Sequence, residues 1–239
     1  MNNLPTIFDL RQVPVLLRGE PLSMRAWIQQ HQAERLWLNV VIVIIGSGLF
    51  GAAVGSWRDP LQALYTAIKL PLILLLTSLG NGLLNAMLAP LFGVNLSLRQ
   101  SLLAVLMSFT IAAVILGAFS PLLYFLIWNI PPLTAGASTN ASAHSLVLLC
   151  ETGMIAFAGI AANVRLLQLL RELSGNANAA RKVLFAWLAG NLLLGSQLAW
   201  ILRPFVGSPY LDVELLRPNA LEGNFFEAVL NHAANLFSK

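Results

Sequence analysis

The sequence predicts an all-α integral membrane protein, a polytopic bundle of about five transmembrane helices with amphipathic interfacial segments at both ends. The first reason is composition, because 57% of the residues are hydrophobic, only 10% are charged and the mean hydropathy is +0.74. A soluble domain carries about a quarter charged residues. The second reason is that the apolar residues gather in long segments, and a helix needs about 20 such residues to cross a membrane. The single cysteine, Cys150, excludes a disulfide framework.

Five segments are long and apolar enough to span a membrane, namely residues 36–57, 61–92, 98–119, 143–173 and 180–202. We expect Pro71 to break the second, because proline lacks the amide hydrogen that a helix interior needs. The third begins with a capping box, with Ser97 at the N-cap and Gln100 three residues later. Residues 120–130 are apolar but too short to span alone, so they either extend the third helix or lie in the interface.

These segments divide the chain into three parts. Residues 1–35 form a cytoplasmic or interfacial N-terminal segment, 36–203 a five-helix transmembrane domain, and 204–239 an extracytoplasmic C-terminal segment. Most Lys and Arg residues fall on the side of the N-terminus, which the positive-inside rule places in the cytoplasm. Apolar residues at helical spacing near the C-terminus predict an amphipathic helix on the outer interface: Phe226, Val229, Leu230, Ala233 and Phe237.

Two charged residues, Lys69 and Glu151, lie inside predicted spans, where charges are rare and by default functional candidates. Each is eight residues from the start of a helix that enters from the outer side, so both lie at a depth of roughly 12 Å along the helix. We therefore expect an intramembrane ion pair. It would either fix the register of two helices or act as an ion or proton relay; alternatively, Lys69 reaches along its helix to the outer surface.

Other polar and small residues in the spans are candidates for helix contacts. Four polar side chains can hydrogen-bond between helices or line a polar crevice: Asn81, Asn85, Asn191 and Gln197. Small residues at four-residue spacing let helix backbones approach closely, either within the chain or between subunits: Ser47, Gly51, Gly55, Ala158, Ala162, Ala186 and Gly190.

A basic patch lies where the last turns of the fourth predicted helix protrude from the membrane and connect to the fifth. It consists of Arg165, Arg171, Arg181 and Lys182. Orientation by the positive-inside rule accounts for it, and docking of an anionic lipid or an acidic partner is the alternative.

Motifs of several function classes are missing from the sequence. There is no HExxH, GxSxG, GxGxxG or Walker A sequence, and the three histidines lack metal-ligand spacing. We therefore expect neither an enzyme nor a cofactor or metal site. A basic and aromatic surface domain of the kind that binds nucleic acid is also lacking.

The arrangement of five spans, a cytoplasmic N-terminal segment and little soluble mass, over roughly residues 36–202, resembles that of the Yip1-like membrane proteins. The resemblance is one of architecture, and it implies a scaffold or membrane-organising role. The stretches GAFSPLLYFLIWN and LRPFVGSP are similar to those of uncharacterised bacterial polytopic proteins. The composition and the short loops indicate a bacterial inner membrane.

The function expected from these features is that of a non-catalytic scaffold or accessory subunit of a larger membrane assembly. Its partners would be membrane lipids and other membrane-protein subunits, or further copies of the same chain. The alternative is a small transporter or channel that uses the Lys69/Glu151 pair.

Overall fold

The structure, a computed structural model, describes residue 14 and residues 32–94, 97–131, 140–207, 210 and 212–237. Of these, 84% are helical and none lies in a strand. The helices are α3 (Gln32–Ser56), α4 (Pro60–Leu88), the short 3-10 helix η1 (Ala89–Phe92), α5 (Leu98–Trp128), α6 (Asn140–Ser174), α7 (Ala177–Leu202) and α8 (Phe225–Phe237). In this part of the chain, five helices, α3 to α7, are long and apolar enough to cross a membrane. The predicted all-α membrane bundle is confirmed.

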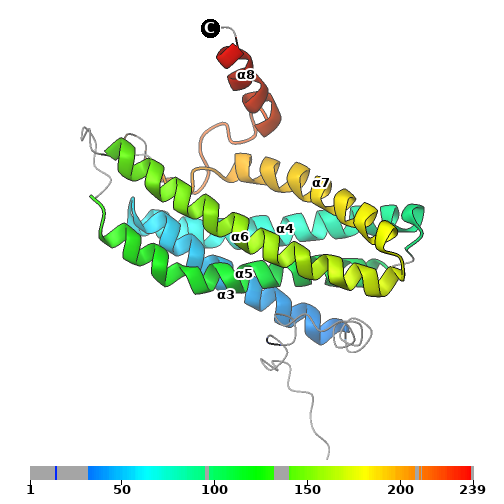
Figure 1. Ribbon diagram of the computed structural model, residues 1–239. Coiled ribbons are helices and arrows are strands. Elements are labelled where there is room, and N and C mark those ends of the chain that lie inside the picture. Colours follow the sequence, from blue (N-terminus) through cyan, green and yellow to red (C-terminus); the bar gives the residue numbers. More distant parts are fainter. Residues whose placement is uncertain are drawn as a thin grey trace, which may run out of the picture.

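The five long helices lie side by side, and α8 projects away from them (Figure 1). Helix α3 packs against α4 and α5, whereas α6 packs against α5 and α7, and α7 also packs against α4. Helices α4 and α6 therefore occupy diagonal positions, with α5 and α7 as their shared neighbours. At one end of the bundle, here called the Trp57 end, α3 and α5 end and α4 and α6 begin.

The helix ends follow from local sequence. Asp59 caps α4, because its carboxylate accepts a hydrogen bond of 2.8 Å from the amide of Leu61. The capping box of Ser97 and Gln100 at the start of α5 is confirmed in both directions. Helix α6 ends at Ser174 and is followed by Gly175, whose φ of 62° is the left-handed conformation that glycine adopts without a steric penalty.

The expectation that Pro71 breaks the second span is wrong, because α4 continues through it without interruption. Proline leaves the carbonyl four residues earlier, that of Ala67, without its helical donor. Gly48 of α3 lies directly against this carbonyl and against the Pro71 ring. Packing of a neighbouring helix against a proline site lets a membrane helix keep its course. Pro121 is likewise inside α5, so residues 120–128 extend the third helix.

The structure describes most of the segment that follows the last span, but little of the segment that precedes the first. The predicted C-terminal amphipathic helix is present as α8, which exposes Val229 and Leu230. Of the predicted N-terminal segment, residues 1–35, the structure describes only residue 14 and residues 32–35, and the latter belong to α3.

Candidate functional site

One face of α4 carries a row of buried polar side chains, here called the α4 polar stripe. Its members repeat at spacings of three or four residues or their multiples, and this pattern places them on one side of a helix. They are 0 to 2% exposed: Gln62, Thr66, Lys69, Thr77, Asn81 and Asn85. Several of them hydrogen-bond α7 or the chain that follows it, so the stripe joins α4 to the last span and its extension.

Lys69 binds the backbone of the segment that follows α7. Its ammonium group donates to the carbonyl oxygen of Pro204 at 2.9 Å and to that of Glu214 at 3.4 Å. Helix α7 stops short of the Trp57 end (Figure 1), so Pro204 lies about two and a half turns into α4. A non-helical backbone at membrane depth needs hydrogen-bond partners within the protein. Lys69 supplies them here.

Gln62 and Thr66 extend this contact toward the Trp57 end. The Gln62 amide nitrogen lies 3.1 Å from the carbonyl oxygen of Pro204 and 2.7 Å from that of Phe205. The Thr66 hydroxyl lies 2.7 Å from the same Phe205 oxygen. Gly207 then packs against Gln62. The three stripe residues thus hold residues 204–207 along α4, and we call this arrangement the C-terminal clasp.

The predicted ion pair between Lys69 and Glu151 is not formed in the described part of the chain. Lys69 donates instead to the two carbonyl oxygens, and the Glu151 Oε1 atom is buried without a hydrogen-bond partner. The reason is topological. The two residues lie on α4 and α6, which are diagonal in the bundle, so similar depth does not bring them together.

The other half of the stripe binds α7 directly. The Asn81 amide group donates to the carbonyl oxygen of Trp187 at 2.9 Å and to the side-chain oxygen of Asn191. Asn85 donates to Asn81 at 2.7 Å, and Gly190 makes room for Asn81 because a Cβ atom there would overlap it. Three of the four predicted polar candidates therefore form one network between α4 and α7.

The fourth polar candidate, Gln197, lies outside this network. Its side-chain oxygen accepts a hydrogen bond of 3.1 Å from the amide of Phe225. It therefore fixes the first residue of α8 to α7.

The small residues singled out in the sequence lie at internal contacts. Gly51 and Gly55 face the backbone of α4 so closely that a Cβ atom at either would overlap it, and Ser47 on the same helix is fully buried. Ala158 and Ala162 of α6 are buried in the main hydrophobic core, and Ala186 of α7 packs against it. The predicted stripes therefore serve packing within the chain.

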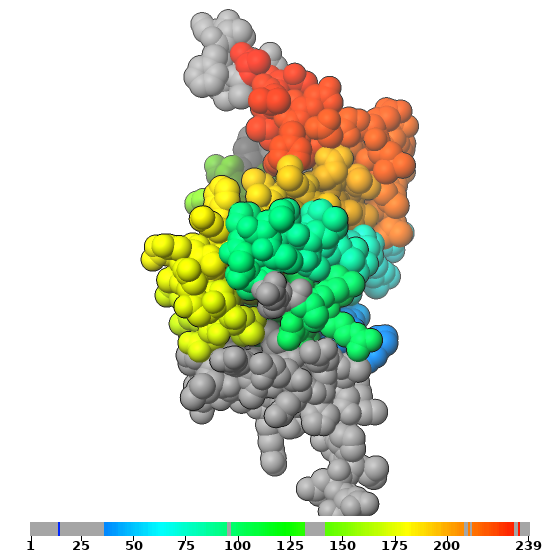
Figure 2. Space-filling model, turned by 90° about the vertical axis from the view of Figure 1, so that its right-hand side faces the viewer, coloured from blue at the N-terminus to red at the C-terminus, as the bar shows by residue number. Residues whose placement is uncertain are grey.

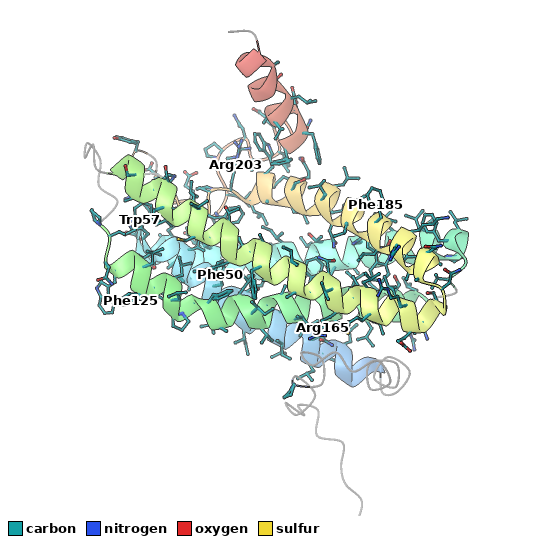
Figure 3. All side chains as sticks on the ribbon, viewed as in Figure 1. Phe50, Trp57, Phe125, Arg165, Phe185 and Arg203 are labelled. Carbon is teal, nitrogen blue, oxygen red and sulfur yellow. The ribbon has the colours of Figure 1, made fainter. Side chains whose placement is uncertain are left out.

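The basic patch lies at the end of the bundle opposite the Trp57 end. This opposite end faces the viewer in Figure 2, where the α6–α7 turn is yellow. Arg171, Arg181 and Lys182 are exposed there. Arg165, labelled in Figure 3, lies further back on α6 and donates to Gln168 at 3.0 Å.

The site residues predicted from the sequence do not include Gln62 and Thr66. The signal was present, because they precede Lys69 by seven and three residues and so share its helix face. Their partners carry no such signal, since they are backbone carbonyl groups. Among the described residues, no three His, Cys, Asp or Glu side chains come together as a metal site would require.

Comparison with known proteins leaves the family open. No family model matches the chain, and neither a curated protein nor a solved structure matches it.

Proposed function

We propose that this membrane protein is a non-catalytic scaffold or accessory subunit that binds a transmembrane helix of a partner protein. The supporting observation is a groove between α6 and α7 with a volume of about 460 Å³. It is lined by Ala156, Gly159, Ile160, Asn163, Val164, Leu167, Leu184 and Leu188. A Yip1-like architecture, a bacterial inner membrane and a cytoplasmic N-terminus belong to the same proposal.

The groove has the features of a helix-docking surface. A Cβ atom added at Gly159 would meet nothing within 4 Å, whereas the glycines of α3 are in contact with other helices. In the most apolar stretch of α6, only 22% of the residues are buried within the chain, and in that of α7 only 11%. Small residues on an open face allow a second helix to approach closely.

Asn163 indicates the chemistry of the partner helix. Its side-chain nitrogen donates to the carbonyl oxygen of Gly159 in its own helix at 2.8 Å, but its side-chain oxygen is buried without a donor. An unsatisfied acceptor in a lipid environment is costly. A partner helix with a Ser or Thr hydroxyl at this depth would satisfy it once a turn of the Asn163 side chain brings the oxygen to the groove surface.

Replacing Gly159 with leucine is the test of this docking site. The new side chain would fill the groove, so we expect the partner recovered by mild detergent extraction to fall at least about tenfold, as for a lost close helix contact of about 1.4 kcal/mol. Native mass spectrometry with identification of every co-eluting chain measures this. Gly153→Leu is the matched control, because Gly153 is equally open but does not line the groove. Equal recovery with both variants, or a native protein that elutes alone, would contradict the proposal.

A small transporter or channel is the second candidate, and Glu151 is the observation that favours it. Its side chain is 7% exposed and its Oε1 atom has no partner among the described residues. Intramembrane carboxyl groups of this kind occur in proton and ion pathways. The proposal predicts pH-dependent flux in liposomes that falls at least about tenfold in Glu151→Gln, as expected when a proton-carrying group is removed. Flux that is absent, or unchanged in the variant, would remove Glu151 from any such pathway.

A further inference from the structure

Two arginines meet at one tryptophan where α7 ends. The guanidinium carbon of Arg203 lies 3.2 Å from the centroid of the Trp200 ring, and that of Arg217 lies 5.3 Å from it. Figure 3 shows Arg203 between the end of α7 and α8. Each guanidinium gains a cation–π contact from the indole. The indole thus gathers two like charges at one point.

The two charges are not neutralised in the described part of the chain. Asp212, Glu214 and Glu222 are close in sequence, yet none forms an ion pair with either arginine. Desolvation, and then the neighbouring Arg217 guanidinium, lower the pKa of Arg203. Two adjacent guanidinium groups repel each other, so a site of this kind favours a bound anion.

Arg217 presents an incomplete hydrogen-bonding edge. Its Nε and Nη2 atoms are both buried without an acceptor. These two N–H groups lie on one side of the guanidinium and bind an oxyanion in a bidentate manner. The Arg217 side chain as a whole is only half-buried, and binding requires a rotation about its side-chain bonds that brings this edge to the surface.

The position of the site selects the kind of oxyanion. It lies at the end of a transmembrane helix, and the C-terminal segment (orange to red in Figure 2) covers α7 on the outside of the bundle. Gln197 fixes the beginning of the amphipathic α8 one turn away from Trp200. Because Arg203 adjoins Pro204, it lies about two and a half turns from the start of α4. Charged side chains at such a depth are accommodated by local thinning of the bilayer, which brings the phosphate of lipid headgroups to them.

We propose that Arg203, Arg217 and Trp200 form a phosphate-binding site that takes the phosphate group of an anionic lipid. Arg217 binds two phosphate oxygens through its Nε and Nη2 atoms, and Arg203 binds from its place on the indole. This site is separate from the basic patch at the other end of α7. It does not depend on the proposed scaffold function.

Native mass spectrometry of the full chain with added phosphatidylglycerol tests the site, with inorganic phosphate in a second titration. We expect Arg203→Gln/Arg217→Gln to weaken lipid binding at least about tenfold, because two charge-assisted hydrogen-bonding groups are lost. Arg203→Lys/Arg217→Lys keeps the charge but loses the planar fork, so its affinity should fall between those of the native protein and the glutamine variant. The helical circular dichroism spectrum shows whether each variant is folded.

The control is Arg99→Gln, which removes an exposed charge at the start of α5, outside the basic patch. Its lipid binding should stay within about twofold of the native value, since exposed charges far from the site act weakly. Equal losses in the glutamine double variant and in this control would mean bulk attraction only and would overturn the site, as would no binding of either probe. Binding of phosphatidylglycerol alone identifies a lipid headgroup, and competition by millimolar phosphate identifies a soluble phosphate as the source.

Discussion

Replacing Lys69 with methionine is expected to lower the free energy of unfolding by about 3 kcal/mol. Methionine has a similar length but no donor. The carbonyl oxygens of Pro204 and Glu214 would lose the ammonium group that now lies 2.9 and 3.4 Å away. Lys69 is 1% exposed, so water does not easily replace it. The Pro204 carbonyl oxygen keeps the Gln62 amide nitrogen at 3.1 Å, so the loss of the donor to Glu214 and of the charge-assisted bond to Pro204 carries most of this cost.

Thermal unfolding in mild detergent, followed by circular dichroism, measures the loss. Limited proteolysis provides a second reading, because a released C-terminal clasp should be cut after α7 while the five helices stay resistant. Lys182→Met is the matched control, since Lys182 is exposed at the start of α7 and makes the same change in charge. A Lys69→Met variant as stable and as protease-resistant as the control would show that the clasp does not depend on the ammonium group.

The sequence pattern predicts the parts of this fold that depend on neighbouring residues. Hydropathy marks the five spans, and the Ser97–Gln100 capping box marks the start of α5. Each of these signals acts within a few residues, so a single sequence contains it completely.

The hydrogen-bond partners of Lys69 cannot be predicted from neighbouring residues. Its acceptors are carbonyl oxygens 135 and 145 residues away, and any residue type supplies a carbonyl oxygen. They become available only because α7 ends early and the chain folds back along α4. The opposite charges of Lys69 and Glu151 at equal depth predicted an ion pair between them. Depth fixes the position of a residue along the membrane normal, but it does not say which helices are neighbours. Which helices are diagonal is decided by packing over the whole bundle.

The contact between α3 and α4 is the second place where a single change should have a large effect. Gly51 faces the carbonyl group of Thr66 so closely that an added Cβ atom would overlap it. Helices α3 and α4 can approach at this distance only because position 51 has no side chain. Thr66 is also a member of the C-terminal clasp, since its hydroxyl lies 2.7 Å from the Phe205 carbonyl oxygen. A displacement of α4 here is therefore transmitted to the end of α7.

Gly51→Leu is expected to lower the free energy of unfolding by about 3 kcal/mol or more, because the overlap is with backbone atoms that have no rotamer to change. Gly51→Ala should show a smaller loss of the same sign, which keeps the prediction testable if the leucine variant does not fold. Thermal unfolding in detergent measures both, and proteolysis after α7 should become faster in both because Thr66 moves. Gly153→Leu, on the open face of α6, adds the same side chain without an overlap and should leave both readings near the native values. Equal losses at positions 51 and 153 would indicate a general effect of leucine in place of glycine, and the close approach of α3 to α4 would then not be what stabilises the clasp.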